Sequence, residues 1–144
     1  MAWLAIAVML SACSQGPAVD IGPNGETTVT VTEDSWFGPI LTDARGLTLY
    51  KPEPNNPNQP DCVGKCARDY PPLTVNGTPS APADLTGQLT VKARADGARQ
   101  VVYNGWPLYR DVGDTDPGDT MAHGIVDEWG HWSVISPDED PPIH

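Results

Sequence analysis

The sequence predicts an all-β fold, a small and turn-rich antiparallel sheet domain built from two related hairpin or meander repeats. Three observations support this prediction. Apolar and polar residues alternate in several short segments, Asp-Gly and Asn-Gly dipeptides lie between such segments, and no stretch has a convincing helical period. The length of 144 residues fits one ordinary domain, and the 14 Gly and 16 Pro fit a chain with many turns.

Alternation identifies the first strand. Residues 27–32 (TTVTVT) place Val29 and Val31 on one face and threonines on the other, which is the pattern of a half-buried strand. Residues 47–50 (LTLY) and residues 132–135 (WSVI) are shorter apolar segments that predict two further strands. Strands are therefore expected near both ends of the folded region.

A three-stranded meander is predicted in the second half of the chain. The dipeptides Asp96-Gly97 and Asn104-Gly105 favour two-residue turns of type I′, because both central residues of that turn need a positive φ. Two such turns in succession connect three strands, and Pro107 puts the third at a sheet edge because proline lacks an N–H. The predicted strands cover residues 88–95, 98–103 and 106–110.

A weak internal repeat appears at an offset of 59 residues, where residues 45–51 (RGLTLYK) align with residues 104–110 (NGWPLYR). Gly, Leu and Tyr coincide, so that Tyr50 matches Tyr109. Two unrelated hairpins can share such common residues, but the duplication of one supersecondary unit is the favoured interpretation.

The N-terminal residues resemble an export signal. Residues 3–10 (WLAIAVML) are apolar but too few to span a bilayer as a helix, which takes about 20 residues. The sequence Leu-Ser-Ala-Cys that ends at Cys13 resembles a lipobox, the cleavage site of bacterial lipoprotein signal peptides. The resemblance implies that residues 1–12 are removed and that acyl chains such as palmitate on Cys13 anchor the protein to a membrane. A secretory signal with an accidental cysteine and a buried hydrophobic strand are the alternatives.

The predicted organisation contains one folded domain. The expected location is extracytoplasmic, with a lipid anchor in a bacterial membrane. The four parts are a lipoprotein signal peptide (1–12), the lipidated Cys with a flexible tether (13–26), a single all-β repeat domain (27–136) and a disordered acidic tail (137–144).

The charge balance limits the possible partners. The chain has 8 Lys and Arg against 19 Asp and Glu, which gives a formal net charge of −11. A nucleic acid is excluded as a partner, because a phosphate backbone needs a basic surface. The same balance argues against holding an anionic membrane surface by charge. A cationic protein is the partner that such a charge attracts.

Several short segments follow one another in a characteristic order along the chain. They are Gly46 to Tyr50, Cys62 to Cys66, Tyr70-Pro71-Pro72-Leu73, Asp96-Gly97, Tyr103 to Tyr109 and Asp116-Pro117-Gly118-Asp119. This order resembles a family of bacterial secreted-repeat lipoproteins that is described by a Tyr-x-aromatic-x-x-Asp motif. The resemblance covers roughly residues 36–136, although Asp111 stands where the second copy of the motif has its aromatic residue.

The resemblance implies a binding or accessory role outside the cytoplasm. The family is largely of unknown function, and some relatives are associated with electron transfer beside c-type cytochromes. The implied partner is therefore a basic electron-transfer protein such as a c-type cytochrome. The candidate motif and partner-surface residues are Tyr50, Tyr109, Asp111, Asp114, Asp116 and Asp119.

Cys62 and Cys66 enclose three residues. In an oxidising compartment two such neighbouring cysteines most often form a disulfide. A loop this short contributes about 2 kcal/mol by the chain-entropy relation, so the bond is expected to act as a local constraint. A redox-active dithiol and a copper-binding pair are the alternatives.

Metal binding is the rival function, with calcium or copper as the ion. Residues 111–119 hold four carboxylates, which are calcium ligands, but Pro117 breaks the spacing of an EF-hand, so a solvated acidic turn is favoured. Met121, His123 and His131 are the candidate copper donors, and each His is better explained as a surface or hydrogen-bonded residue.

No catalytic residue and no cofactor are predicted. The chain lacks the Gly-x-Ser-x-Gly and His-Glu-x-x-His motifs, a phosphate-binding Gly-rich loop, and the Cys-x-x-Cys-His signature of covalent haem, so an enzyme is not expected. The large aromatic side chains are expected in or near the core, because a small β domain needs their volume. They are Trp36, Tyr103, Trp106, Tyr109, Trp129 and Trp132.

Overall fold

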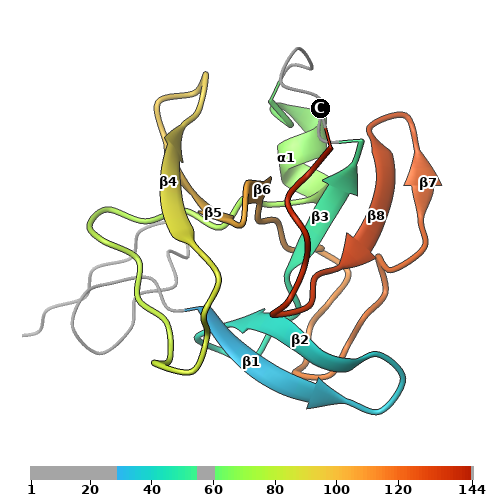
Figure 1. Cartoon of the computed structure of the whole chain (residues 1–144). Coiled ribbons are helices and arrows are strands. Elements are labelled where there is room, and N and C mark those ends of the chain that lie inside the picture. The colour runs from blue at the N-terminus through green and yellow to red at the C-terminus, as the bar shows by residue number, and fades with distance from the viewer. Residues whose placement is uncertain (1–28, 55–60, 144) are drawn as a thin grey trace, which may run out of the picture.

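The computed structural model describes residues 29–54 and 61–143. In this part of the chain, short strands form three small antiparallel sheets beside a single short helix, which confirms the all-β prediction (Figure 1). In chain order, the elements are β1 (Val29–Asp34), β2 (Gly38–Asp43), β3 (Tyr50–Glu53), α1 (Lys65–Asp69), β4 (Leu89–Ala93), β5 (Arg99–Tyr103), β6 (Trp106–Pro107), β7 (Val126–Asp127) and β8 (Gly130–Val134).

The sheets combine neighbouring strands with one long-range pairing. Strands β1 and β2 form a hairpin, and β4, β5 and β6 form the meander that the turn dipeptides predict. The third sheet has the order β3-β8-β7, so a strand from the first half of the chain pairs with one from the end. Figure 1 shows the β4-β5-β6 sheet and the β3-β8-β7 sheet on opposite sides of the view, with the β1-β2 hairpin below them.

The two predicted type I′ turns differ. Asn104 and Gly105 have φ values of 48° and 85°, as a type I′ turn requires. At the other turn Gly97 has a φ of 86°, but Asp96 is not left-handed. The Arg94 N–H bonds the Ala98 carbonyl at 2.9 Å, so a longer loop with a single left-handed glycine connects β4 to β5.

Three elements escape prediction from the sequence. In β2 the last four residues are all buried, so the strand shows no alternation. The helix α1 has five residues, too few to display a helical period. Strand β7 has two residues and exists through its pairing with β8. Each of these elements depends on tertiary contacts more than on a local pattern.

The two predicted repeats meet at their matched tyrosines. The Tyr50 N–H donates to the Tyr109 carbonyl at 2.8 Å, and the Tyr109 N–H donates to the Tyr50 carbonyl at 3.0 Å. The preceding leucines are also equivalent, because the Leu49 N–H donates to the Leu41 carbonyl in β2 and the Leu108 N–H donates to the Val101 carbonyl in β5. Each repeat is therefore a meander of three segments, and the two meanders lie antiparallel at the tyrosines.

The end of each repeat pairs with the other repeat. Tyr50 of the first repeat pairs with Val134 of β8, and Tyr109 of the second pairs with Pro72. In addition, the Leu41 N–H donates to the Ile135 carbonyl at 2.9 Å, and the Val101 N–H donates to the Leu73 carbonyl at 2.8 Å. This exchange of terminal segments is symmetric, which supports the duplication of one supersecondary unit.

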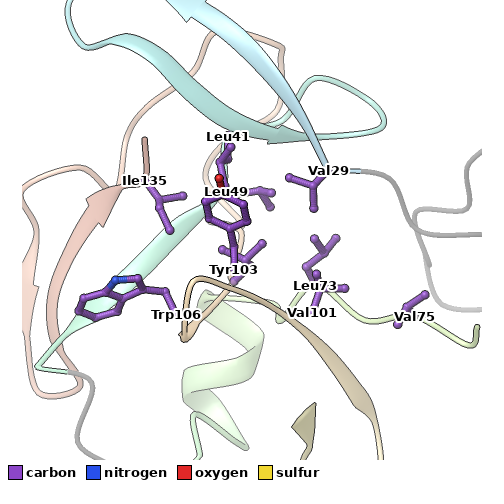
Figure 2. Close-up of a cluster of buried hydrophobic side chains, with 10 residues drawn as sticks. Val29, Leu41, Leu49, Leu73, Val75, Val101, Tyr103, Trp106 and Ile135 are labelled. Carbon is purple, nitrogen blue, oxygen red and sulfur yellow. The ribbon is translucent and has the colours of Figure 1, made fainter. Parts of the chain in front are cut away.

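The core has two parts, and both repeats contribute to each. In the larger part, Leu41 and Leu49 of the first repeat converge with Tyr103 and Ile135 of the second (Figure 2). The smaller part gathers aromatic rings around Trp132, which is fully buried. The buried residues of this smaller part are Tyr50, Cys66, Tyr70, Tyr109, Ala122 and Trp132.

The C-terminal tail, expected to be disordered, accepts hydrogen bonds from both repeats as far as Asp140. The Trp106 indole N–H donates to the Asp140 carbonyl at 2.7 Å, and the Asn104 amide donates to the Glu139 carbonyl at 3.0 Å. The Tyr103 hydroxyl bonds the Pro137 carbonyl, and the Lys51 ammonium bonds the Glu139 carboxylate. Side-chain donors thus hold an acidic segment that has no apolar pattern of its own.

We expect the substitution Trp106→Phe to loosen this tail. The phenyl ring keeps most of the packing but removes the indole N–H, so the free energy of unfolding should fall by about 1 kcal/mol. Amide hydrogen exchange should speed up in residues 138–142, as measured by mass spectrometry. The same change at an exposed position, Trp36→Phe, is the control. Unchanged exchange in the tail would contradict the assigned role of Trp106.

Candidate functional site

The acidic loop, residues 111–119, is an exposed turn that its own carboxylates organise. The Asp119 carboxylate accepts the N–H groups of Thr115 and Asp116, both at 3.0 Å, and these bonds hold the pKa of Asp119 below its usual range. The Asp111 carboxylate accepts the Gly113 N–H at 3.0 Å. This arrangement is the hydrogen-bonded acidic turn that the sequence favours.

Both ends of the acidic loop are attached to the domain. The Val112 N–H donates to the Asp69 carbonyl at the end of α1, at 2.9 Å. At the other end the Thr48 hydroxyl donates to the Asp119 carbonyl at 2.6 Å. The exposed Asp116 and the half-buried Asp111 and Asp119 are therefore presented from a fixed backbone.

Asp114 differs from the other carboxylates of the loop because it is only 7% exposed. It accepts the Tyr50 hydroxyl at 2.6 Å and the Met121 N–H at 3.0 Å. Burial raises the pKa of Asp114 above its usual range, although the bond from Tyr50 acts in the opposite direction. Burial and the nearby Asp114 charge also raise the pKa of Tyr50. Asp114 is thus a structural partner of the first repeat.

The candidate partner surface needs a correction. Tyr50 and Tyr109 are buried at the junction of the repeats, and Asp114 is buried with them, so these residues present no surface to a partner. Asp111 is half-buried, Asp116 is exposed and Asp119 is half-buried. The sequence places all of them in one motif, but only the tertiary contacts separate the structural members from the accessible ones.

The cysteine pair forms the predicted disulfide, Cys62–Cys66, at the start of α1. Cys66 is buried in the smaller core part, next to the aromatic rings. There Tyr70 stacks on Trp132 with ring centroids 3.8 Å apart, and the Tyr70 hydroxyl donates to Asp127 at 2.7 Å. Bonded sulfurs are not the thiolates that bind copper. The disulfide therefore fixes α1 against the core.

The candidate copper donors have other environments. The Nδ1 atom of His123 accepts the Val134 N–H at 3.2 Å, and the Nδ1 atom of His131 lies 3.8 Å from the Glu53 carboxylate. Met121 is 63% exposed. Within residues 29–54 and 61–143, no group of three or more His, Cys, Asp or Glu side chains is arranged to hold a metal ion.

The expectation that Trp36 lies in or near the core is wrong. Trp36 is 87% exposed in the turn between β1 and β2, whereas Trp106 and Trp132 are buried as expected and Trp129 is partly buried. Turn residues surround it in the sequence, since Asp34-Ser35 precede the Trp36-Phe37 pair and Gly38-Pro39 follow it. That context is the signal that indicates an exposed hairpin turn.

The lipidation candidate Cys13 and the tether lie outside the described residues. Among the helices of the described segments, none is long and apolar enough to cross a membrane.

Comparison with known proteins gives one result. A family described as a secreted repeat of unknown function matches residues 90–135. The match begins in β4 and ends just after β8, so it covers the second repeat and confirms the resemblance to secreted-repeat proteins over this segment. Searches of curated proteins and of solved structures found no match. The secreted repeat implies a location outside the cytoplasm.

We expect Asp114→Asn to change how the stability depends on pH. The folded pKa of Asp114 is raised, so the folded state binds the proton more tightly than the unfolded chain, and the contribution of Asp114 falls as the pH rises through the folded pKa. The amide can still bond Tyr50 and Met121 but carries no charge. The free energy of unfolding of the variant minus that of the wild-type protein, both measured by urea titration, should therefore increase as the pH rises from 4 to 7.

The matched control is Asp116→Asn, which removes an exposed charge from the same loop. If the free energy of unfolding of the wild-type protein increased relative to that of the Asp114→Asn variant with rising pH, the assignment of Asp114 as a buried carboxylate with a raised pKa would be wrong.

Proposed function

We propose that this protein is a membrane-anchored extracytoplasmic lipoprotein with a binding or accessory role. It docks a basic electron-transfer partner, such as a c-type cytochrome, through the acidic loop. The observation that carries the proposal is the presentation of three accessible carboxylates, one exposed and two half-buried, on a backbone held at both ends, by Asp69 and by Thr48. The resemblance to secreted-repeat proteins supports the location.

The distribution of charge supports a cationic partner. Residues 111–136 contain no Lys or Arg, although they include the whole acidic loop and strands β7 and β8. A surface with an excess of one sign of charge raises the rate at which an oppositely charged protein associates, by a factor of about 10 to 1,000. Since exposed charges are screened over about 8 Å at physiological ionic strength, this attraction weakens as salt rises. The resulting contact is transient, as an accessory role in electron transfer requires.

The first test of this proposal neutralises the accessible carboxylates of the loop. We expect the triple variant Asp111→Asn, Asp116→Asn and Asp119→Asn to associate with a basic c-type cytochrome about 10-fold more slowly at low salt, because steering depends on these charges. The measurement is stopped-flow association at two salt concentrations. Asparagine keeps an acceptor for the Gly113, Thr115 and Asp116 N–H groups, so the loop should keep its conformation.

The control variant carries the same change of net charge outside the loop, as Asp84→Asn, Asp138→Asn and Asp140→Asn at three exposed positions. Equal association rates for the two triple variants would show that the loop has no special part in docking. Association that does not depend on salt would also contradict the proposal.

The second test concerns the anchor. We expect Cys13→Ser to move the protein from the membrane fraction to the soluble fraction, because several acyl chains are needed for stable anchoring and serine at this position receives none. Fractionation with immunodetection is the measurement, and the neighbouring change Ser14→Ala is the control. Retention of the Cys13→Ser variant in the membrane fraction would exclude Cys13 as the site of the anchor.

A further inference from the structure

The turn between β1 and β2 exposes aromatic side chains on an ordered backbone. The Asp34 carboxylate accepts the N–H groups of Trp36 at 2.7 Å and of Phe37 at 3.0 Å, so side-chain-to-main-chain bonds fix the turn. The Trp36 side chain takes almost no part in packing, because 87% of its surface is accessible. Figure 1 shows this hairpin at the lower edge of the molecule, with its turn reaching away from the sheets.

A second exposed apolar segment lies beside this turn. The ring of Phe37 packs on the ring of His123 with centroids 4.2 Å apart, and His123 is itself bonded to the Val134 N–H. The segment around His123 exposes three large apolar side chains, of which Val126 is 76% exposed. We call these residues the tip surface: Trp36, Phe37, Met121, Ile125 and Val126. Such a group of exposed apolar side chains marks a contact surface.

The tip surface is built from segments whose Asp and Glu side chains are not matched by any Lys or Arg of the same segments. The two segments that build it, residues 29–42 and 111–136, contain no Lys or Arg. Glu33 is exposed beside the turn, and Asp116 is exposed on the acidic loop. The surface therefore matches a partner that presents apolar side chains within a basic rim. An anionic lipid headgroup would be repelled by the same carboxylates, so the charge favours a protein over a membrane.

We infer that the tip surface is the apolar contact of the docking face, with Trp36 as the side chain that the basic partner buries. This inference rests on the proposed function and assigns a different task to each part of the face. The acidic loop governs the association rate, because exposed charges act before contact. Trp36 governs the dissociation rate, because tryptophan is enriched among the residues that dominate binding energy and acts only after contact.

The test compares two alanine variants of the full chain, Trp36→Ala and the control Val63→Ala. Val63 is an exposed apolar residue in the disulfide loop, outside the tip surface. The probes are a basic c-type cytochrome and polylysine, and the measurement is surface plasmon resonance at two salt concentrations. We expect Trp36→Ala to raise the Kd for the cytochrome about 30-fold through faster dissociation. The Kd for polylysine, which offers charge alone, should not change.

The outcomes separate this inference from the proposed function. If the wild-type protein bound neither probe at low salt, the proposed function and the inference would both fall. If the wild-type protein bound the cytochrome and Trp36→Ala bound it equally well, only the inference would fall.

A third probe tests a membrane as the occupant of the tip surface. Phosphatidylcholine vesicles are mixed with the Cys13→Ser variant, which lacks the proposed anchor, with and without Trp36→Ala. Sedimentation with the vesicles that depends on Trp36 would identify a lipid contact and overturn the assignment to a basic protein. We expect no sedimentation of either variant.

Discussion

The reciprocal main-chain pairing of Tyr50 with Tyr109 is the interaction on which the rest of the structure depends. Each repeat alone is a three-segment meander with one face uncovered, and a unit of this size cannot bury enough apolar surface by itself. The pairing brings the two units together, and each then lends its last segment to the other, through Val134 and Pro72. Both parts of the core then contain residues of both repeats, although the matched secreted-repeat segment covers a single repeat.

Buried polar groups of the two repeats pair with one another across this junction. Asp43 of the first repeat is fully buried and lies 3.5 Å from the guanidinium of Arg110 in the second. Tyr50 and Asp114 form a second cross-repeat bond, from the Tyr50 hydroxyl to the Asp114 carboxylate at 2.6 Å. Buried polar groups of this kind are costly when unmatched, so these pairs favour the register in which they form. The aromatic stack of Tyr70 on Trp132 completes the junction.

The fold and the proposed function depend on different carboxylates of the acidic loop. Asp114 is buried and fixes the loop to the core, whereas Asp116 is exposed and free to act on a distant charge. The tail adds to this division, because its Glu139 is bonded to Lys51 and so is already neutralised. Asp116 and the tip surface take no part in the junction. The proposed docking face can therefore change without disturbing the junction that holds the repeats together.

The sequence by itself determined the elements that local chemistry fixes. Alternation located β1, and the turn dipeptides located the strands of the second meander. The Asn104-Gly105 dipeptide set a type I′ turn because both residues accept a positive φ, and the spacing of Cys62 and Cys66 predicted their disulfide. Only the tertiary structure decided which chemically similar residues are buried. It hid Tyr50 and Asp114 in the junction, exposed Trp36, and held the tail on Trp106. Burial depends on partners far away in the chain, and no local pattern encodes them.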